Sequence, residues 1–197
     1  MGKIFCLMGK SATGKDTIYK KLTEDQELLL RRLVPYTTRP IRDGESEGRE
    51  YHFVDEETLE RLQKAGKVVE LRVYDTVQGL WKYFTVCDDN MDLEHHSYAV
   101  IGTLESWNTM RNYFGQDIMV PIYIEVEDGL RLSRALERER QQEEPHYAEL
   151  CRRFLADQED FSEENLKNAH ITHRFQNTDL HTCLDEIKLF IQNQPIV

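Results

Sequence analysis

The sequence has few cysteines, and none of them lie close together. The four cysteines stand at positions 6, 87, 151 and 183, and no Cys-x-x-Cys pair occurs. In a chain of 197 residues this distribution is typical of reduced thiols, and it excludes a disulfide framework and a cysteine-ligated zinc site. A chain of this length can bury an apolar core of its own, as a single domain.

Long hydrophobic runs are also missing. No stretch approaches the ~20 apolar residues that a membrane-spanning helix needs. The first residues have a strand-and-loop pattern, without the apolar region of a signal peptide. We therefore expect a soluble, cytoplasmic protein that has no membrane partner.

Positive charge is scarce, because the formal net charge is −11. This balance argues against a general affinity for nucleic acid polymers or anionic membranes. A phosphate ligand would have to be held by local positive charge. Residues 31–42 supply such charge, with arginines at positions 31, 32, 39 and 42.

A glycine-bounded loop near the N-terminus carries the clearest motif. The apolar run Ile4–Met8 predicts a buried strand, the loop 9–15 follows it, and a helical pattern covers residues 16–22. Strand, loop and helix in this order are the context of a Walker A phosphate loop, whose N–H groups and helix dipole face one phosphate. Lys15 would then reach the β- and γ-phosphates of ATP.

The position after Lys15 departs from the usual motif. It holds Asp16 where the pattern has Ser or Thr, so Thr17 is the candidate for the hydroxyl near Mg²⁺. Mg²⁺ would keep several waters and bridge the phosphates. The expected ATP-binding residues of the loop are Gly9, Lys10, Ser11, Ala12, Thr13, Gly14, Lys15, Asp16 and Thr17.

Most of the remaining chain alternates between helical and strand patterns. We expect strands at 98–102, 118–126 and 171–175, helices at 104–113 and 180–192, and a charged helical region at 129–168 that is interrupted near Pro145. This alternation predicts an α/β fold whose parallel sheet is flanked by helices, with ligands at the carboxyl ends of the strands.

Residues 36–86 interrupt the alternation with a strand-rich insertion. Asp55 is the expected N-cap of a helix over residues 56–65. Strands are expected at 51–54, 68–74 and 80–86, and the last two flank a turn at Gln78-Gly79.

With both segments in view, the chain resembles the guanylate kinase family of nucleoside monophosphate kinases. The resemblance is carried by residues 9–17, Tyr36-Thr37-Thr38-Arg39-Pro40, Arg42, Gly44-Glu45, Tyr51-His52-Phe53, Glu70 and Asn177. It implies a single domain, 1–197, with a P-loop NTPase-type core at 1–34, 97–128 and 154–197. It also implies a nucleoside-monophosphate-binding insertion at 35–96 and a helical lid at about 129–153.

The resemblance also implies the acceptor site. Arginine forks and a tyrosine hydroxyl suit the acceptor phosphate, and a carboxylate suits the N1 and N2 hydrogens of guanine. Arg39, Arg42 and Tyr51 would hold the phosphate, and Glu70 would accept from the base. The full set of expected substrate residues is Tyr36, Arg39, Arg42, Tyr51, Glu70, Tyr83, Thr85 and Thr103.

Two positions depart from the family pattern. Pro35 stands where the family usually has a serine that contacts the base, and proline has no side-chain donor. Thr103 stands in place of an aspartate, with Glu105 as the nearest carboxylate. Lost contacts to a base edge reduce discrimination between bases, so these changes weaken the guanine assignment more than the kinase chemistry.

Four arginines mark the expected lid, at positions 134, 138, 140 and 153. In the family, lid arginines neutralise the transferring phosphoryl group while the lid excludes water. Arg153 matches one such position, and either Arg138 or Arg140 matches the other. Ion pairing with neighbouring glutamates is the alternative. Asn177 would border the donor adenine, although a turn asparagine is equally natural there.

The expected function is transfer of the ATP γ-phosphoryl group to GMP or dGMP. Catalysis would consist of positioning and charge neutralisation by Lys15, Arg39, Arg153 and Arg138 or Arg140. One alternative is a non-enzymatic module that binds phosphorylated peptides, which the intact phosphate loop disfavours. Another is a kinase of the same fold that acts on a different monophosphate or a phosphosugar. The sequence leaves the oligomeric state open.

Overall fold

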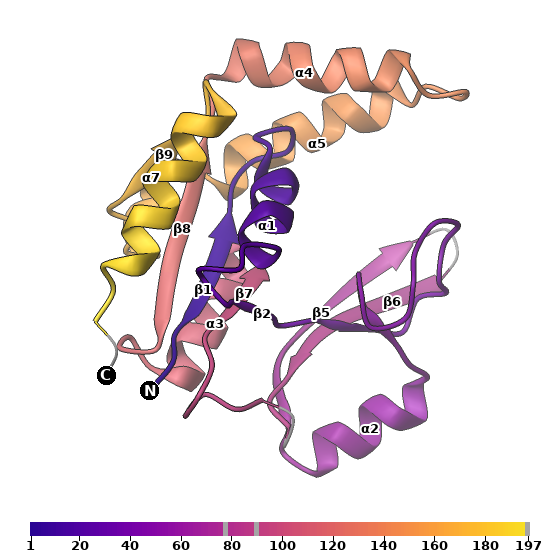
Figure 1. The fold of residues 1–197 in the computed structure, drawn as a ribbon. Coiled ribbons are helices and arrows are strands. Elements are labelled where there is room, and N and C mark those ends of the chain that lie inside the picture. Colours follow the sequence, from indigo (N-terminus) through magenta and orange to yellow (C-terminus); the bar gives the residue numbers. More distant parts are fainter. Residues whose placement is uncertain (77–78, 89–90, 196–197) are drawn as a thin grey trace.

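A computed structural model describes residues 1–76, 79–88 and 91–195, so Gln78 of the predicted turn lies outside the described residues. The central sheet is parallel (Figure 1). Its strand order is β2 (Arg31–Arg32), β7 (Tyr98–Ile101), β1 (Ile4–Met8), β8 (Met119–Glu125) and β9 (Arg174–Gln176). The predicted α/β fold with a parallel sheet flanked by helices is confirmed.

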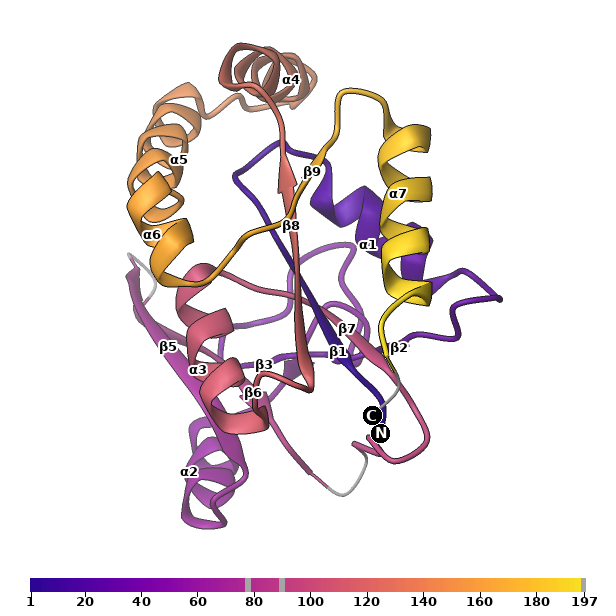
Figure 2. The ribbon, with the colours of Figure 1, turned by 90° about the vertical axis from the view of Figure 1, so that its left-hand side faces the viewer.

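Both faces of this sheet are covered, which explains the continuous apolar run of β1. Alternate side chains of a strand point to opposite faces. Ile4, Cys6 and Met8 therefore join one apolar cluster, whereas Phe5 and Leu7 join the other. Helices α1 (Lys15–Thr23) and α7 (Leu180–Gln192) pack on the second face, and α3 (Leu104–Phe114) packs on the first (Figure 2).

The insertion forms a second, smaller sheet with its own apolar cluster. Its strand order is β4 (His52–Phe53), β3 (Tyr36–Thr37), β6 (Gly79–Val86) and β5 (Val68–Thr76). Helix α2 (Glu56–Lys64) packs Leu59 against Phe84 and Val86. Asp55 caps α2 by accepting from the Thr58 N–H at 2.8 Å, as predicted.

The charged region after β8 forms three helices in place of one interrupted stretch. They are α4 (Asp128–Arg140), α5 (Tyr147–Asp160) and α6 (Glu163–Asn168), and the break after α4 contains Pro145. The last strand begins later than the predicted 171–175, because only Arg174–Gln176 pair with β8. Ile171, at the start of the predicted strand, lies in the apolar core beside the sheet and does not pair with β8.

None of the helices in the described part of the chain combines the length and the apolar character needed to cross a bilayer.

Candidate active site

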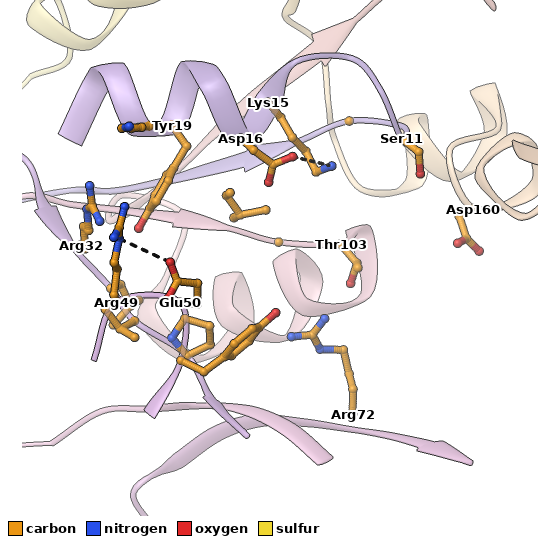
Figure 3. Close-up of a pocket in the computed structure, with 18 of the residues that line it drawn as sticks. Ser11, Lys15, Asp16, Tyr19, Arg32, Arg49, Glu50, Arg72, Thr103 and Asp160 are labelled. Atoms are coloured by element: carbon orange, nitrogen blue, oxygen red, sulfur yellow. Dashed lines mark ion pairs between the residues drawn. The ribbon is translucent and has the colours of Figure 1, made fainter. Parts of the chain in front are cut away.

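A cleft of about 500 Å³ separates the phosphate loop from the insertion (Figure 3). The core lines it with the end of β1, the first turns of α1 and the end of β7, and α5 contributes acidic residues. The insertion faces them across the cleft with side chains that include Tyr51 and Arg72. Six residues expected from the sequence line this cleft: Gly9, Ser11, Lys15, Asp16, Tyr51 and Thr103.

The phosphate loop is tightly curled, and two glycines make the curl possible. Gly14 has φ +85° and directly precedes α1, and a Cβ atom there would lie 2.5 Å from Asn177 Nδ2. A Cβ atom on Gly9 would lie 2.4 Å from the Ile124 carbonyl oxygen. Side chains at these positions would push the loop off the sheet, so the backbone has the close curl that cradling a phosphate requires.

Asn177 contacts the phosphate loop, and its expected place beside the donor adenine stays a prediction. Its Nδ2 donates to the Thr13 carbonyl at 2.7 Å, and its backbone N–H donates to the Glu125 carbonyl at 2.9 Å. The residue is only 3% exposed. Arg134 of α4 in turn donates to the Asn177 carbonyl at 3.1 Å. These contacts use the Nδ2 atom and both backbone groups of Asn177 inside the protein, whereas its buried Oδ1 has no hydrogen-bond partner among the described residues.

Asp16, and not Thr17, lies in the cleft. The Lys15 ammonium and the Asp16 carboxylate both line it and lie 3.8 Å apart. Consecutive side chains of a helix point about 100° apart, so Thr17 turns away from the cleft onto the exposed side of α1. Of these two residues only Asp16 lines the cleft, and the expectation that Thr17 supplies the group near Mg²⁺ stays a prediction.

Arg39 is buried in the insertion with its fork already filled. Its Nη1 and Nη2 atoms donate to the two carboxylate oxygens of Glu45 at 2.7 and 2.6 Å, and Nε donates to the Tyr83 hydroxyl at 3.1 Å. The Tyr51 ring lies 5.0 Å from the guanidinium. Arg42 is exposed and lies over the Trp81 ring. The two predicted forks are therefore not both open to a phosphate in this conformation.

The Arg39–Glu45 pair should weaken in acid. The bonds from Arg39 hold the pKa of Glu45 below its ordinary value of 4.5. The pair therefore contributes its full stability above that ordinary value and loses it as the pH falls through the lower folded value. We expect wild type and Glu45→Gln to differ in free energy of unfolding at pH 7, and we expect this difference to shrink as the pH falls below 4.5. Urea titrations at several pH values measure this difference, and a constant difference down to pH 3 would contradict it.

Glu70 is buried on β5 of the insertion, with its carboxylate already bonded. Thr85 Oγ1 donates to Oε1 at 2.9 Å. Arg72 donates from Nε to Oε2 at 3.0 Å and from Nη2 to Oε1 at 3.3 Å. Tyr36 points elsewhere, since its hydroxyl lies 3.4 Å from Asp88 and its ring stacks on Phe84. Tyr36 does not line the cleft in this conformation, and its contact with substrate stays a prediction.

The expected lid arginines lie outside the main cleft. Arg138 and Arg153 line a small cavity between α4 and α5, and Arg140 is exposed. Arg153 Nε lies 3.2 Å from Glu149, so the ion-pair alternative describes it in this conformation. A role in phosphoryl transfer would require α4 and α5 to move toward the cleft.

Two residues that the sequence analysis missed join the lid to the phosphate loop. Arg131 is 1% exposed, and its guanidinium bridges Asp128 at 2.9 Å and Asp157 at 3.0 Å over the Phe154 ring. Asp157 Oδ2 also accepts from the Ser11 backbone N–H at 2.7 Å. An aspartate three residues before Arg131 on one helix face was a readable signal. The contact with Asp157, however, depends on packing between two helices.

Comparison with known proteins identifies the family. The guanylate kinase family model matches residues 1–194. The guanylate kinase of Porphyromonas gingivalis is 27% identical over 191 residues, which cover 95% of each chain. That of Anaplasma phagocytophilum is 32% identical over 125 residues, or 61% of this chain and 59% of the relative. Its crystal structure matches with a TM-score of 0.63 and 22% identity, covering all of this chain and 88% of that one. Together with the fold and the phosphate loop, the family match over nearly the whole chain shows that this protein belongs to the guanylate kinase family.

Proposed function

We propose that this protein transfers the γ-phosphoryl group of ATP to GMP or dGMP, giving ADP and the nucleoside diphosphate. The observation that carries this proposal is one continuous cleft between the phosphate loop, with Lys15, and the insertion, with Tyr51 and Arg72. Two nucleotides bound on opposite sides of this cleft would place the γ-phosphate of one near the phosphate of the other. In-line transfer needs no general base beyond the acceptor phosphate oxygen.

The charges of the cleft support this chemistry. Lys15 would neutralise charge on the β- and γ-phosphates, and the N–H groups at the start of α1 would hold the phosphates by hydrogen bonds. Asp16 fits the role of Mg²⁺ ligand, because Mg²⁺ in nucleotide sites takes one or two carboxylates and otherwise binds phosphates and water. The described residues contain no group of three or more possible metal ligands, which agrees with a metal held mainly by the nucleotide.

We further propose that the parts of the chain have the roles that the family assigns to them. Residues 35–96 would bind the acceptor, and the segment at about 129–153 would act as the lid. Arg138 or Arg140, together with Arg153, would reach the phosphates only after this segment closes over the cleft. Arg39 and Arg42 would hold the acceptor phosphate after the phosphate has replaced the Glu45 carboxylate at the Arg39 guanidinium.

A coupled assay with ATP, Mg²⁺ and a panel of GMP, dGMP, AMP, CMP and UMP tests the proposal. We expect turnover with GMP and dGMP. No turnover with any member of the panel would reject the kinase assignment, and turnover with AMP or CMP alone would reject the base assignment. Binding of ATP measured by calorimetry separates the kinase from a phosphopeptide-binding module, which would leave the phosphate loop unused.

A further inference from the structure

At three positions, in the insertion and just after β7, the described residues offer no free hydroxyl donor for the 6-oxygen of a guanine, and Tyr51, which also lines the cleft, is expected to bind the phosphate. Pro35 lines the cleft without a side-chain donor. The Thr103 hydroxyl is the N-cap of α3, where it accepts from the Ser106 N–H at 3.2 Å and donates its own O–H to Ser106 Oγ at 3.4 Å. The Thr85 hydroxyl donates to Glu70. Another group has to satisfy this oxygen if guanine is to be preferred, because an unpaired acceptor costs binding energy.

Arg72 is the donor that the structure places there. It follows Glu70 by two residues on β5, so both side chains leave the strand on the same face. Its side chain is 15% exposed and lines the cleft, and Figure 3 shows its guanidinium reaching toward Thr103. Two of its five N–H groups bond Glu70. The longer of these two bonds, at 3.3 Å, is the one that a ligand would replace most easily.

The Glu70 carboxylate is 3% exposed and is bonded to Arg72, so a base that replaced the 3.3 Å bond would meet an acceptor beside a donor. The pairing edge of guanine presents the complement, with N–H donors at N1 and N2 beside the acceptor O6. Arginine donating to guanine O6 is a common specific contact in nucleic acid recognition. Adenine carries an amino donor at position 6 instead. This donor would face the N–H donors of Arg72, and neither would have an acceptor.

We propose that Arg72 is a specificity-determining residue that donates to O6 of the guanine base while Glu70 accepts from N1 and N2. This inference rests on the proposed GMP kinase function and extends it. Arg72 thereby replaces the donor that Pro35 cannot supply. A purely structural Arg72 would hold Glu70 in place and have no contact with O6.

The test compares GMP with 6-thio-GMP, in which sulfur, a weak acceptor, replaces O6. We expect wild type to lose about tenfold or more in kcat/KM on this replacement. Arg72→Met should lower kcat/KM for GMP by a similar factor and lose the sensitivity to sulfur. Arg49→Met is the matched control, since Arg49 lines the same cleft but pairs with Glu50 at 3.4 Å, and it should keep the sensitivity.

The outcomes separate this inference from the proposed function. Wild type that does not turn over GMP rejects both. A second outcome is that wild type turns over GMP and that Arg72→Met has the wild-type ratio of kcat/KM for GMP to kcat/KM for 6-thio-GMP. This outcome rejects the role of Arg72 and leaves the proposed function standing. If Arg72→Met fails to fold because Glu70 is left buried and unpaired, the double variant Glu70→Gln/Arg72→Met removes both charges. It should likewise be insensitive to sulfur, and a wild-type ratio in it would overturn the inference.

Discussion

Lys15→Ala should lower kcat for phosphoryl transfer by about 10³-fold or more, because it removes the lysine at the start of α1 that lines the cleft and would stabilise charge in the transition state. The Lys15 ammonium lines the cleft, and its ion-pair partner is Asp16 at 3.8 Å. An exposed pair of this kind contributes little to folding, so the variant should unfold at nearly the wild-type temperature. Steady-state kinetics with ATP and GMP, together with thermal unfolding, measure both properties.

Lys20→Ala is the matched control for this experiment. Lys20 also lines the cleft, but it lies in the last turn of α1, away from the phosphate loop. It should reduce kcat much less than Lys15→Ala does. If Lys15→Ala keeps kcat within tenfold of wild type, or if the two variants lose activity equally, Lys15 does not contact the transferred group.

Arg131→Ala should lower the free energy of unfolding by about 3–5 kcal/mol, because it leaves the largely buried Asp157 carboxylate without its cation. Asp128 adds little to this loss, because its side chain is 41% exposed and keeps Lys10 at 3.5 Å. Arg131 is fully buried between Asp128 and Asp157, and its guanidinium lies 4.2 Å from the Phe154 ring centre. A domain of this size is stable by only about 5–15 kcal/mol, so the loss should appear as a large shift of the urea midpoint.

A surface arginine on the same lid gives the comparison. Arg152 pairs with Glu149 three residues away, at 2.7 Å, and its side chain is 65% exposed. Arg152→Ala should change the free energy of unfolding by less than about 1 kcal/mol, as exposed pairs do. A loss in Arg131→Ala no larger than that in Arg152→Ala would show that the buried bridge does not hold α4 to α5.

The parts of the fold that depend on neighbouring residues could be predicted from the sequence. The strand Ile4–Met8 and the loop after it are encoded within one short segment, and the Asp55 cap lies three residues from the N–H that it accepts. Local pattern also predicted the alternation that produces the parallel sheet. In these places propensity, spacing and packing all favour the same structure.

The roles of individual site residues were harder to predict, because they depend on contacts between distant segments. Asn177 bonds Thr13 across 164 residues, and Arg131 bonds Asp157 across 26. Arg39 was expected to face a phosphate, but the fork is filled by Glu45, which stands in the same motif. A sequence pattern shows which groups can pair, but not which partner each group takes in the absence of ligand.

The bond between Asp157 and the Ser11 N–H links nucleotide entry to the position of α5. One N–H makes one strong hydrogen bond at a time. A phosphate that binds this amide must therefore displace the Asp157 carboxylate, which is also negatively charged. The apparent affinity for the nucleotide is therefore the intrinsic affinity multiplied by the fraction of molecules in which Asp157 does not occupy this amide. By reciprocity, each nucleotide that takes this amide weakens the attachment of α5 to the loop, of which the bond from Lys10 to Gln158 remains.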